Sequence, residues 1–367
     1  MKKQKSSQQL GILIGGLMGA AVWTMYSRAQ TWGKDISILF ELFLSLFVCI
    51  YAQIFLHEVG RLIFGLLSGY RFRSFRVGSV IWIRTDKGIE RKRIRVIGSA
   101  VQCLMSPPEG DEEKISCGWF LMGGVLMNLL SALVALALYC AFRSQEALAR
   151  FLLTWTIIGT AMALVNGLPL RAGLDNNDGC TARAVCTSRE AKHAFLTQVR
   201  LSGFLSSDKR IRDVPADILP EENDLSNHAT AVLAPFHAKR LLDAHRFDEA
   251  RAEIDRLLAA DSTIADAELQ LLACDRMYLA ALNGETERLS ELRTPARQRF
   301  LKQMRLHPAV LRTEYACALL ADKDSAKADA YLARFEDVAK RYPYAGKIEG
   351  ERELIALAKQ KGTQNDG

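Results

Sequence analysis

The sequence has no C-x-x-C pair, and no long apolar run follows about residue 170. Its eight cysteines are scattered, and Cys49 and Cys140 lie inside apolar segments, where a small, soft side chain simply packs. The spacing therefore indicates neither a disulfide framework nor a zinc knuckle. The lack of later apolar runs divides the chain into an apolar first half and a charged, Ala- and Leu-rich second half with helical periodicity.

Four apolar segments can be compared with the roughly 20 residues that a helix needs to cross a bilayer. They are Leu10–Tyr26, Ile36–Leu56, Gly118–Phe142 and Phe151–Leu168. The first follows a basic start and precedes Ser27-Arg28-Ala29, which could be a signal-peptide cleavage site. Its apolar core exceeds the usual length of the apolar region of a signal peptide, and Gly15 with Gly19 forms a small-xxx-small packing face. We therefore expect an uncleaved anchor and about four transmembrane helices.

A basic stretch follows the second apolar segment. Nine basic residues lie between Arg71 and Arg95, against Asp86 and Glu90. Basic loops stay on the cytoplasmic side of a membrane, and they contact anionic lipid. With a basic N-terminus and four crossings, the pattern predicts an integral protein of the cell membrane with both termini in the cytoplasm. Contact with membrane lipid is expected, and contact with nucleic acid is not.

The basic stretch is also strand-like. Phe72–Val77, Val80–Arg84 and Ile89–Ile97 are rich in β-branched and aromatic residues, and Thr85–Gly88 is typical of a hairpin turn. Gly98–Pro108 predicts a further strand that ends at its two prolines. Because strand edges cannot face lipid, we expect a small β-sheet, inserted at about residues 72–105, at the cytoplasmic interface or buried among helices.

The second half predicts a soluble α-helical domain. Its helical segments are Thr230–Ala244, Asp248–Ala260, Ile264–Leu282, Pro308–Leu320, Ala326–Arg341 and Lys347–Lys359. Phe247–Ala250 resembles the start of the second helix of a tetratricopeptide hairpin, but no clear 34-residue period follows. A tetratricopeptide-like array and an ordinary helical bundle both stay open. The predicted fold is mainly α, with a membrane domain over residues 1–188, a linker over 189–225 and a cytoplasmic helical domain over 226–367.

Ionisable residues stand near the end of the second apolar segment. His57 and Glu58 begin the pattern H-E-x-x-H, in which two histidines on one helical face bind zinc and the Glu activates a zinc-bound water. A charged pair at membrane depth is by itself a functional-site hypothesis. After the last apolar segment the chain continues with Asn166-Gly-Leu-Pro169 and then Asp178-Gly179. A carboxylate there could supply a zinc ligand from a different helix.

This order of motifs resembles the site-2 protease family of membrane zinc metallopeptidases. The resemblance covers about Leu44 to Ala184, and it includes Gln102–Pro108 and Gly124-x-x-x-Asn128. It implies an intramembrane zinc endopeptidase that acts on membrane-associated peptides or proteins. The residues implied are the zinc ligands His57 and Asp178, with Asp175 as a substitute, the base Glu58, the supporting Asn128 and Asn166, and a substrate-pairing strand near Val101–Leu104. Without the resemblance, Asn128 could be a contact between helices and His57 a hydrogen-bonded core residue.

One position departs from the family pattern. Arg61 stands where the family has its second His, and a guanidinium has no lone pair for zinc and stays protonated. We hypothesise that Arg61 pairs with Glu58 and Asp178, so that its charge replaces that of the metal. The chain would then be an inactive pseudoprotease that binds membrane peptides or acts as a regulatory scaffold. Alternatively, Cys180 or Cys103 could complete a zinc site.

A third interpretation is a membrane-anchored adaptor in which the helical array binds a protein partner. The carboxylates of Glu58 and Asp178 argue against it, because a simple anchor has no need of charge at membrane depth.

Overall fold

The computed structural model describes residues 36–85, 88–94, 101–169, 171–172, 175–215, 218–219 and 224–365. The chain separates into two compact units. The first, called here the membrane unit, contains residues 1–72 and 100–192, and the second, called here the helical unit, contains residues 73–99 and 193–367. The first predicted membrane helix, Leu10–Tyr26, lies outside the described residues.

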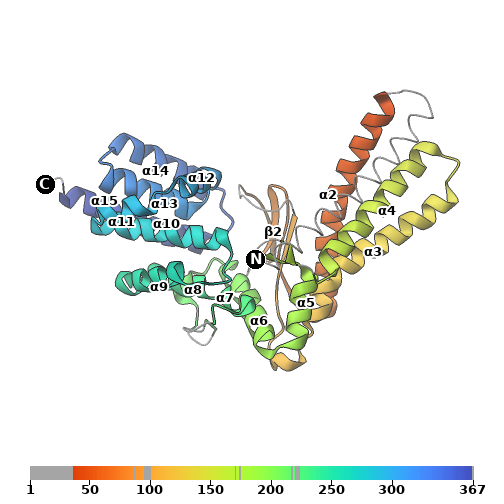
Figure 1. Cartoon of the computed structure of the whole chain (residues 1–367), viewed down its shortest axis with the longest axis horizontal. Coiled ribbons are helices and arrows are strands. Elements are labelled where there is room, and N and C mark those ends of the chain that lie inside the picture. Colours follow the sequence, from red (N-terminus) through yellow and green to blue (C-terminus); the bar gives the residue numbers. More distant parts are fainter. Residues whose placement is uncertain are drawn as a thin grey trace. The chain divides into compact units, whose positions relative to one another are not determined.

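Three long apolar helices form the membrane unit. They are α2 (Ile36–Leu67), α3 (Cys117–Ala141) and α4 (Glu146–Gly167), and they pack side by side (Figure 1). Each is long and apolar enough to cross a membrane. The predicted segments over residues 36–56, 118–142 and 151–168 are thus confirmed as helices. Large apolar side chains such as Phe43, 70% exposed, cover the outer faces, as expected for helices that contact lipid.

Helix α2 continues 11 residues beyond the predicted end at Leu56. His57, Glu58 and Arg61 interrupt the apolar run, but Leu62–Phe64 and Leu66–Leu67 resume it, so the helix continues to Leu67. The ionisable residues therefore lie inside a continuous helix.

Two glycines allow α2 and α3 to approach closely. A Cβ on Gly60 would lie 2.4 Å from the Gly123 carbonyl oxygen, and a Cβ on Gly123 would lie 2.7 Å from that of Gly60. Such contacts between small residues are typical of membrane helix pairs. They hold the ionisable segment of α2 directly against α3.

The predicted small β-sheet is present. Strands β1 (Arg71–Val77), β2 (Val80–Thr85) and β3 (Gly88–Arg93) form an antiparallel meander, and β4 (Val101–Ser106) completes a sheet of order β3-β2-β1-β4. Thr85 pairs with Gly88, as the predicted hairpin turn requires. Two short strands, β5 (Arg171–Ala172) and β6 (Asp175–Asn176), follow α4. They lead into α5 (Asp178–Thr187).

Helices continue from α5 to the end of the chain. Helix α6 (Arg189–Leu205) and the 3-10 turn η2 (Ile211–Asp213) occupy part of the predicted linker over residues 189–225, and the 3-10 turn η1 (Glu112–Lys114) precedes α3. The remaining helices are α7 (His228–Ala231), α8 (Ala234–Asp243), α9 (Phe247–Ala259), α10 (Asp266–Asn283), α11 (Thr286–Leu292), α12 (Pro295–Gln303), α13 (Pro308–Ala316), the π-helical turn η3 (Cys317–Ala321), α14 (Ser325–Ala339) and α15 (Ala345–Asn365).

Every helical segment predicted after residue 230 contains a helix. Helices α11 and α12 were not predicted, because they have only 7 and 9 residues and are mostly polar. The core of the helical unit centres on α10, whose residues Leu272–Ala280 are buried without a gap. A helix buried on all sides needs neighbours around it, and α9, α13 and α11 provide them.

Candidate functional site

His57 and Asp178 are neighbours although 121 residues separate them in the sequence. His57 lies on α2 with 8% of its surface exposed, and its Nε2 is 2.9 Å from Oδ2 of Asp178, the first residue of α5. A carboxylate in the first turn of a helix is favoured by the helix dipole. The two residues that the sequence proposed as zinc ligands therefore hydrogen-bond to each other.

Asn177 fixes the position of Asp178. Its side chain caps α5 by accepting from the Cys180 N–H at 2.8 Å, and its Nδ2 donates to the carbonyls of Val165 and Leu168 at the end of α4. Gly179 permits this approach, since a Cβ there would lie 2.2 Å from the Gly167 carbonyl oxygen. Sequence reasoning did not identify Asn177, although an Asn directly before a helix is a typical N-cap signal.

Glu58 points towards strand β4. Its Oε2 accepts a 2.7 Å hydrogen bond from the Cys103 backbone N–H, and its Oε1 lies 4.0 Å from Nη1 of Arg61. The Arg61 guanidinium also lies over the Phe120 ring of α3, 5.1 Å from its centroid. The predicted pairing of Arg61 with Glu58 is thus present at the limit of an ion pair.

The predicted pairing of Arg61 with Asp178 is not found in the described part of the chain. Asp178 instead hydrogen-bonds to His57, whose Nε2 lies 2.9 Å from its Oδ2. Two further predicted site residues, Asn166 and Asp175, have no described side-chain contact with this group. Asn166 donates its Nδ2 to the Met162 carbonyl of its own helix, and only the backbone of Asp175 is described, in β6.

A line of polar residues runs along the contact between α2 and α3, and we call Gln53, His57, Asn128 and Ser131 the polar seam. Gln53 and Ser131 hydrogen-bond across it at 3.1 Å. The His57 ring contacts α3 at Gly124, where a Cβ would lie 2.4 Å from Nε2. Asn128 follows one helical turn later on the same face of α3. The seam thus continues from a satisfied pair to the His57 ring.

Within the described residues, several buried polar atoms of this region lack a hydrogen-bond partner. They are Nδ1 of His57, Nε of Arg61 and both polar atoms of the Asn128 carboxamide. Asn128 has no exposed surface. A buried polar group without a partner costs about 1–3 kcal/mol, so these atoms are candidates for contacts with a bound group.

The donor set does not fit a zinc centre. A catalytic zinc site uses three protein ligands, but beside His57 and Asp178 the remaining ligand position of the family pattern holds Arg61, which has no lone pair. Neither Cys180 nor Cys103 completes the set. Among the described residues, no group of three or more His, Cys, Asp and Glu side chains lies close enough together to hold a metal. Burial, and then the charge of Glu58, raise the pKa of the Cys103 thiol to about 12.

Comparison of this chain with protein-family models, with curated proteins and with solved structures finds no match. The chemistry of the site is therefore argued from its own residues.

Proposed function

We propose that this chain is an integral membrane protein of site-2-protease-like organisation that binds a membrane-associated peptide segment and does not hydrolyse it. The observation that carries the proposal is the pairing of the site's charges within the protein. His57 is bonded to Asp178, and Glu58 is held between the Cys103 N–H and Arg61. Each group that metal-dependent hydrolysis would use already has a partner on this chain.

The unpaired atoms of the polar seam support peptide binding. The Asn128 carboxamide offers two N–H donors and one acceptor oxygen, which are complementary to the C=O and N–H of a peptide group. A peptide segment that unwinds inside a membrane has backbone groups that lipid cannot satisfy. Asn128, together with Nδ1 of His57, would supply partners for such a backbone and would satisfy their own hydrogen-bonding capacity in the same contact.

The orientation in the membrane follows from charge. The basic residues between Arg71 and Arg95 favour the cytoplasmic side for the loop after α2, where they would contact anionic lipid. With a further crossing at Leu10–Tyr26, both termini and the helical unit would lie in the cytoplasm. The helical unit would there be available to a protein partner.

The test compares the native chain with Arg61→His in lipid nanodiscs. Zinc content is measured by elemental analysis, and the probe is a fluorescent peptide of about 20 Leu and Ala residues with a central Gly-Pro pair, which is long enough to cross the bilayer. We expect the native chain to contain no stoichiometric zinc and to bind the probe without cleaving it. Arg61→His restores a third donor beside His57 and Asp178, so it should retain about one zinc per chain.

The two parts of the proposal fail separately. About one zinc per native chain, lost in His57→Ala, would overturn the metal-free assignment. Native chain that lacks zinc and also fails to bind the probe would overturn peptide binding while leaving the metal-free assignment in place.

A further inference from the structure

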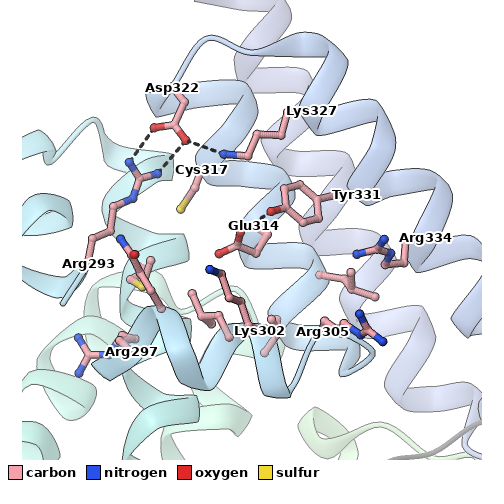
Figure 2. A pocket seen from close by; sticks show the side chains of 15 residues that line it. Arg293, Arg297, Lys302, Arg305, Glu314, Cys317, Asp322, Lys327, Tyr331 and Arg334 are labelled. Atoms are coloured by element: carbon pink, nitrogen blue, oxygen red, sulfur yellow. Dashed lines mark hydrogen bonds and ion pairs between the residues drawn. The ribbon is translucent and has the colours of Figure 1, made fainter. Parts of the chain in front are cut away.

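The helical unit contains a cavity of about 610 Å³ whose walls are strongly basic (Figure 2). Helices α12, α13 and α14 and the end of α11 line it, together with the π-helical turn η3. Two acidic side chains, Glu314 and Asp322, face six basic ones: Arg293, Arg297, Lys302, Arg305, Lys327 and Arg334. The cavity therefore carries an excess of positive charge, and its volume is in the range of small-molecule sites.

Part of this charge is paired within the cavity wall. Arg293 donates from both terminal nitrogens to Asp322, at 2.7 and 3.1 Å, and Nζ of Lys327 lies 3.9 Å from the same carboxylate. Arg297 donates to the Leu292 carbonyl at 2.7 Å. Glu314 accepts from the Tyr331 hydroxyl at 2.7 Å. Figure 2 shows Asp322 between Arg293 and Lys327, with its contacts to both.

Three cations in the same cavity have no such partner. Lys302 from α12, Arg305 just after α12 and Arg334 from α14 form no hydrogen bond or ion pair with any residue that the structure describes. All three side chains belong to exposed residues, so their charges are solvated. Lys302 and Arg305 come from α12 and the residues just after it, and Arg334 comes from α14, so two separate elements contribute cations to the lining of one cavity.

The backbone beside the cavity is also unusual. Residues Cys317–Ala321 form a π-helical turn, and the Asp322 N–H donates to the Cys317 carbonyl at 2.9 Å, five residues back. π-helical turns are rare in proteins, and those that occur are often found at functional sites. Here the turn ends at Asp322, the residue that orients Arg293. It is an observation independent of the charges, and it belongs to the same cavity.

We propose that this cavity binds a multivalent phosphate anion, with Lys302, Arg305 and Arg334 as its principal ligands. A phosphate group carries up to two negative charges and three acceptor oxygens, and Arg forks bind it in a bidentate geometry. A monovalent carboxylate gains less, because Glu314 and Asp322 in the same wall repel it. A ligand with several charges can use the three unpaired cations together and outweigh that repulsion.

The experiment measures pyrophosphate binding by isothermal titration calorimetry to the full chain in nanodiscs of neutral lipid. Loss of one charge-assisted hydrogen bond weakens binding by about tenfold or more, and we expect this for Lys302→Gln, Arg305→Gln and Arg334→Gln. Arg299→Gln is the matched control. Arg299 lies on α12, has the same charge and is also exposed, but it is outside the cavity lining. Circular dichroism checks that each variant retains its helices.

Two sources of the phosphate can be distinguished. If the natural ligand is a lipid headgroup, nanodiscs that contain a phosphoinositide should weaken the apparent affinity for free pyrophosphate. If it is a soluble phosphorylated molecule, the affinity should be the same in both nanodiscs. The proposal is overturned if the native chain does not bind pyrophosphate, or if the three cavity variants and Arg299→Gln bind it equally well.

Discussion

The two units differ in how their most buried polar side chains are hydrogen-bonded. In the helical unit, Arg312 is 1% exposed, donates to Glu351 at 3.0 Å and to Asp275 at 2.5 Å, and lies 4.5 Å from the centre of the Tyr278 ring. In the membrane unit, Asn128 is equally buried, and neither of its polar atoms has a partner among the described residues. A satisfied network holds helices together, whereas an unsatisfied group marks a place where something else can bind.

The helical unit also has buried polar atoms without a partner in the described part of the chain, one each in His237, Ser262, Arg276 and His307. The other nitrogens of Arg276 and His307 are bonded, Arg276 to Asp255 and Glu285 and His307 to Lys347. His237 and Ser262 are partly exposed residues. Asn128 differs from all four because it has no exposed surface and both polar atoms of its side chain are unpaired.

The largest expected effect comes from breaking the satisfied network. Arg312→Leu leaves Asp275 and Glu351 buried without their cation, which should cost about 3–5 kcal/mol. Amide protection in α10 and α13 should then fall by more than a hundredfold in hydrogen exchange measured by mass spectrometry on the full chain.

The matched control for this change is Arg352→Leu. Arg352 also pairs with a carboxylate, Glu336, at 2.7 Å, but both side chains are more than 40% exposed. An exposed pair contributes only about 0–1 kcal/mol. Equal, small losses of protection in the two variants would show that the Arg312 network does not hold these helices together.

A smaller effect is expected from pH. Burial, followed by the charges of Lys347, Lys239 and Arg312, lowers the pKa of His307 well below 6.5. His307 takes up a proton near pH 6.5 in the unfolded chain but not in the folded chain. The neutral, buried His307 therefore contributes its full share of the folding stability only above that pH. This contribution should be lost at up to about 1.4 kcal/mol per pH unit as the pH falls towards the folded pKa.

Hydrogen exchange of α13 and α15 between pH 7.5 and 5.5, corrected for the intrinsic exchange rate, measures this loss. His307→Gln keeps an acceptor for Lys347 but cannot titrate, so it should flatten the pH dependence. His193→Gln, at an exposed position on α6, should leave it unchanged. A pH profile that His307→Gln does not alter would assign the loss to other groups.

Sequence reasoning was most successful where a pattern extends over many residues. The apolar runs predicted α2, α3 and α4, and the β-branched runs around Thr85–Gly88 predicted the sheet. The contacts within the candidate site were harder to predict. Sequence spacing placed His57 and Asp178 in one candidate site, and the structure brings them to 2.9 Å.

Individual contacts could not be predicted, for physical reasons. The partner of Asp178 depends on side-chain directions at the start of α5, and the hydrogen bond from Cys103 to Glu58 uses a backbone N–H, which every residue except proline has. Arg61 was identified as the key departure from the motif, but its position over Phe120 depends on how closely α3 packs. Such contacts are set by packing between helices and not by sequence spacing.

The last prediction tests the unsatisfied side of the comparison. Asn128→Leu removes a buried carboxamide without breaking any hydrogen bond of its side chain in the described structure, so the membrane unit should become more stable, by about 1 kcal/mol. Binding of the Leu-Ala peptide probe should instead weaken by about tenfold, because a peptide group loses its partner. Ser131→Ala breaks the bond to Gln53 one turn away, so it should destabilise the same helix pair. Thermal unfolding in nanodiscs and fluorescence anisotropy measure the two effects. Opposite signs for stability and binding in Asn128→Leu are the signature of a group kept for a ligand, whereas a loss of both would mean that Asn128 is a structural contact between helices.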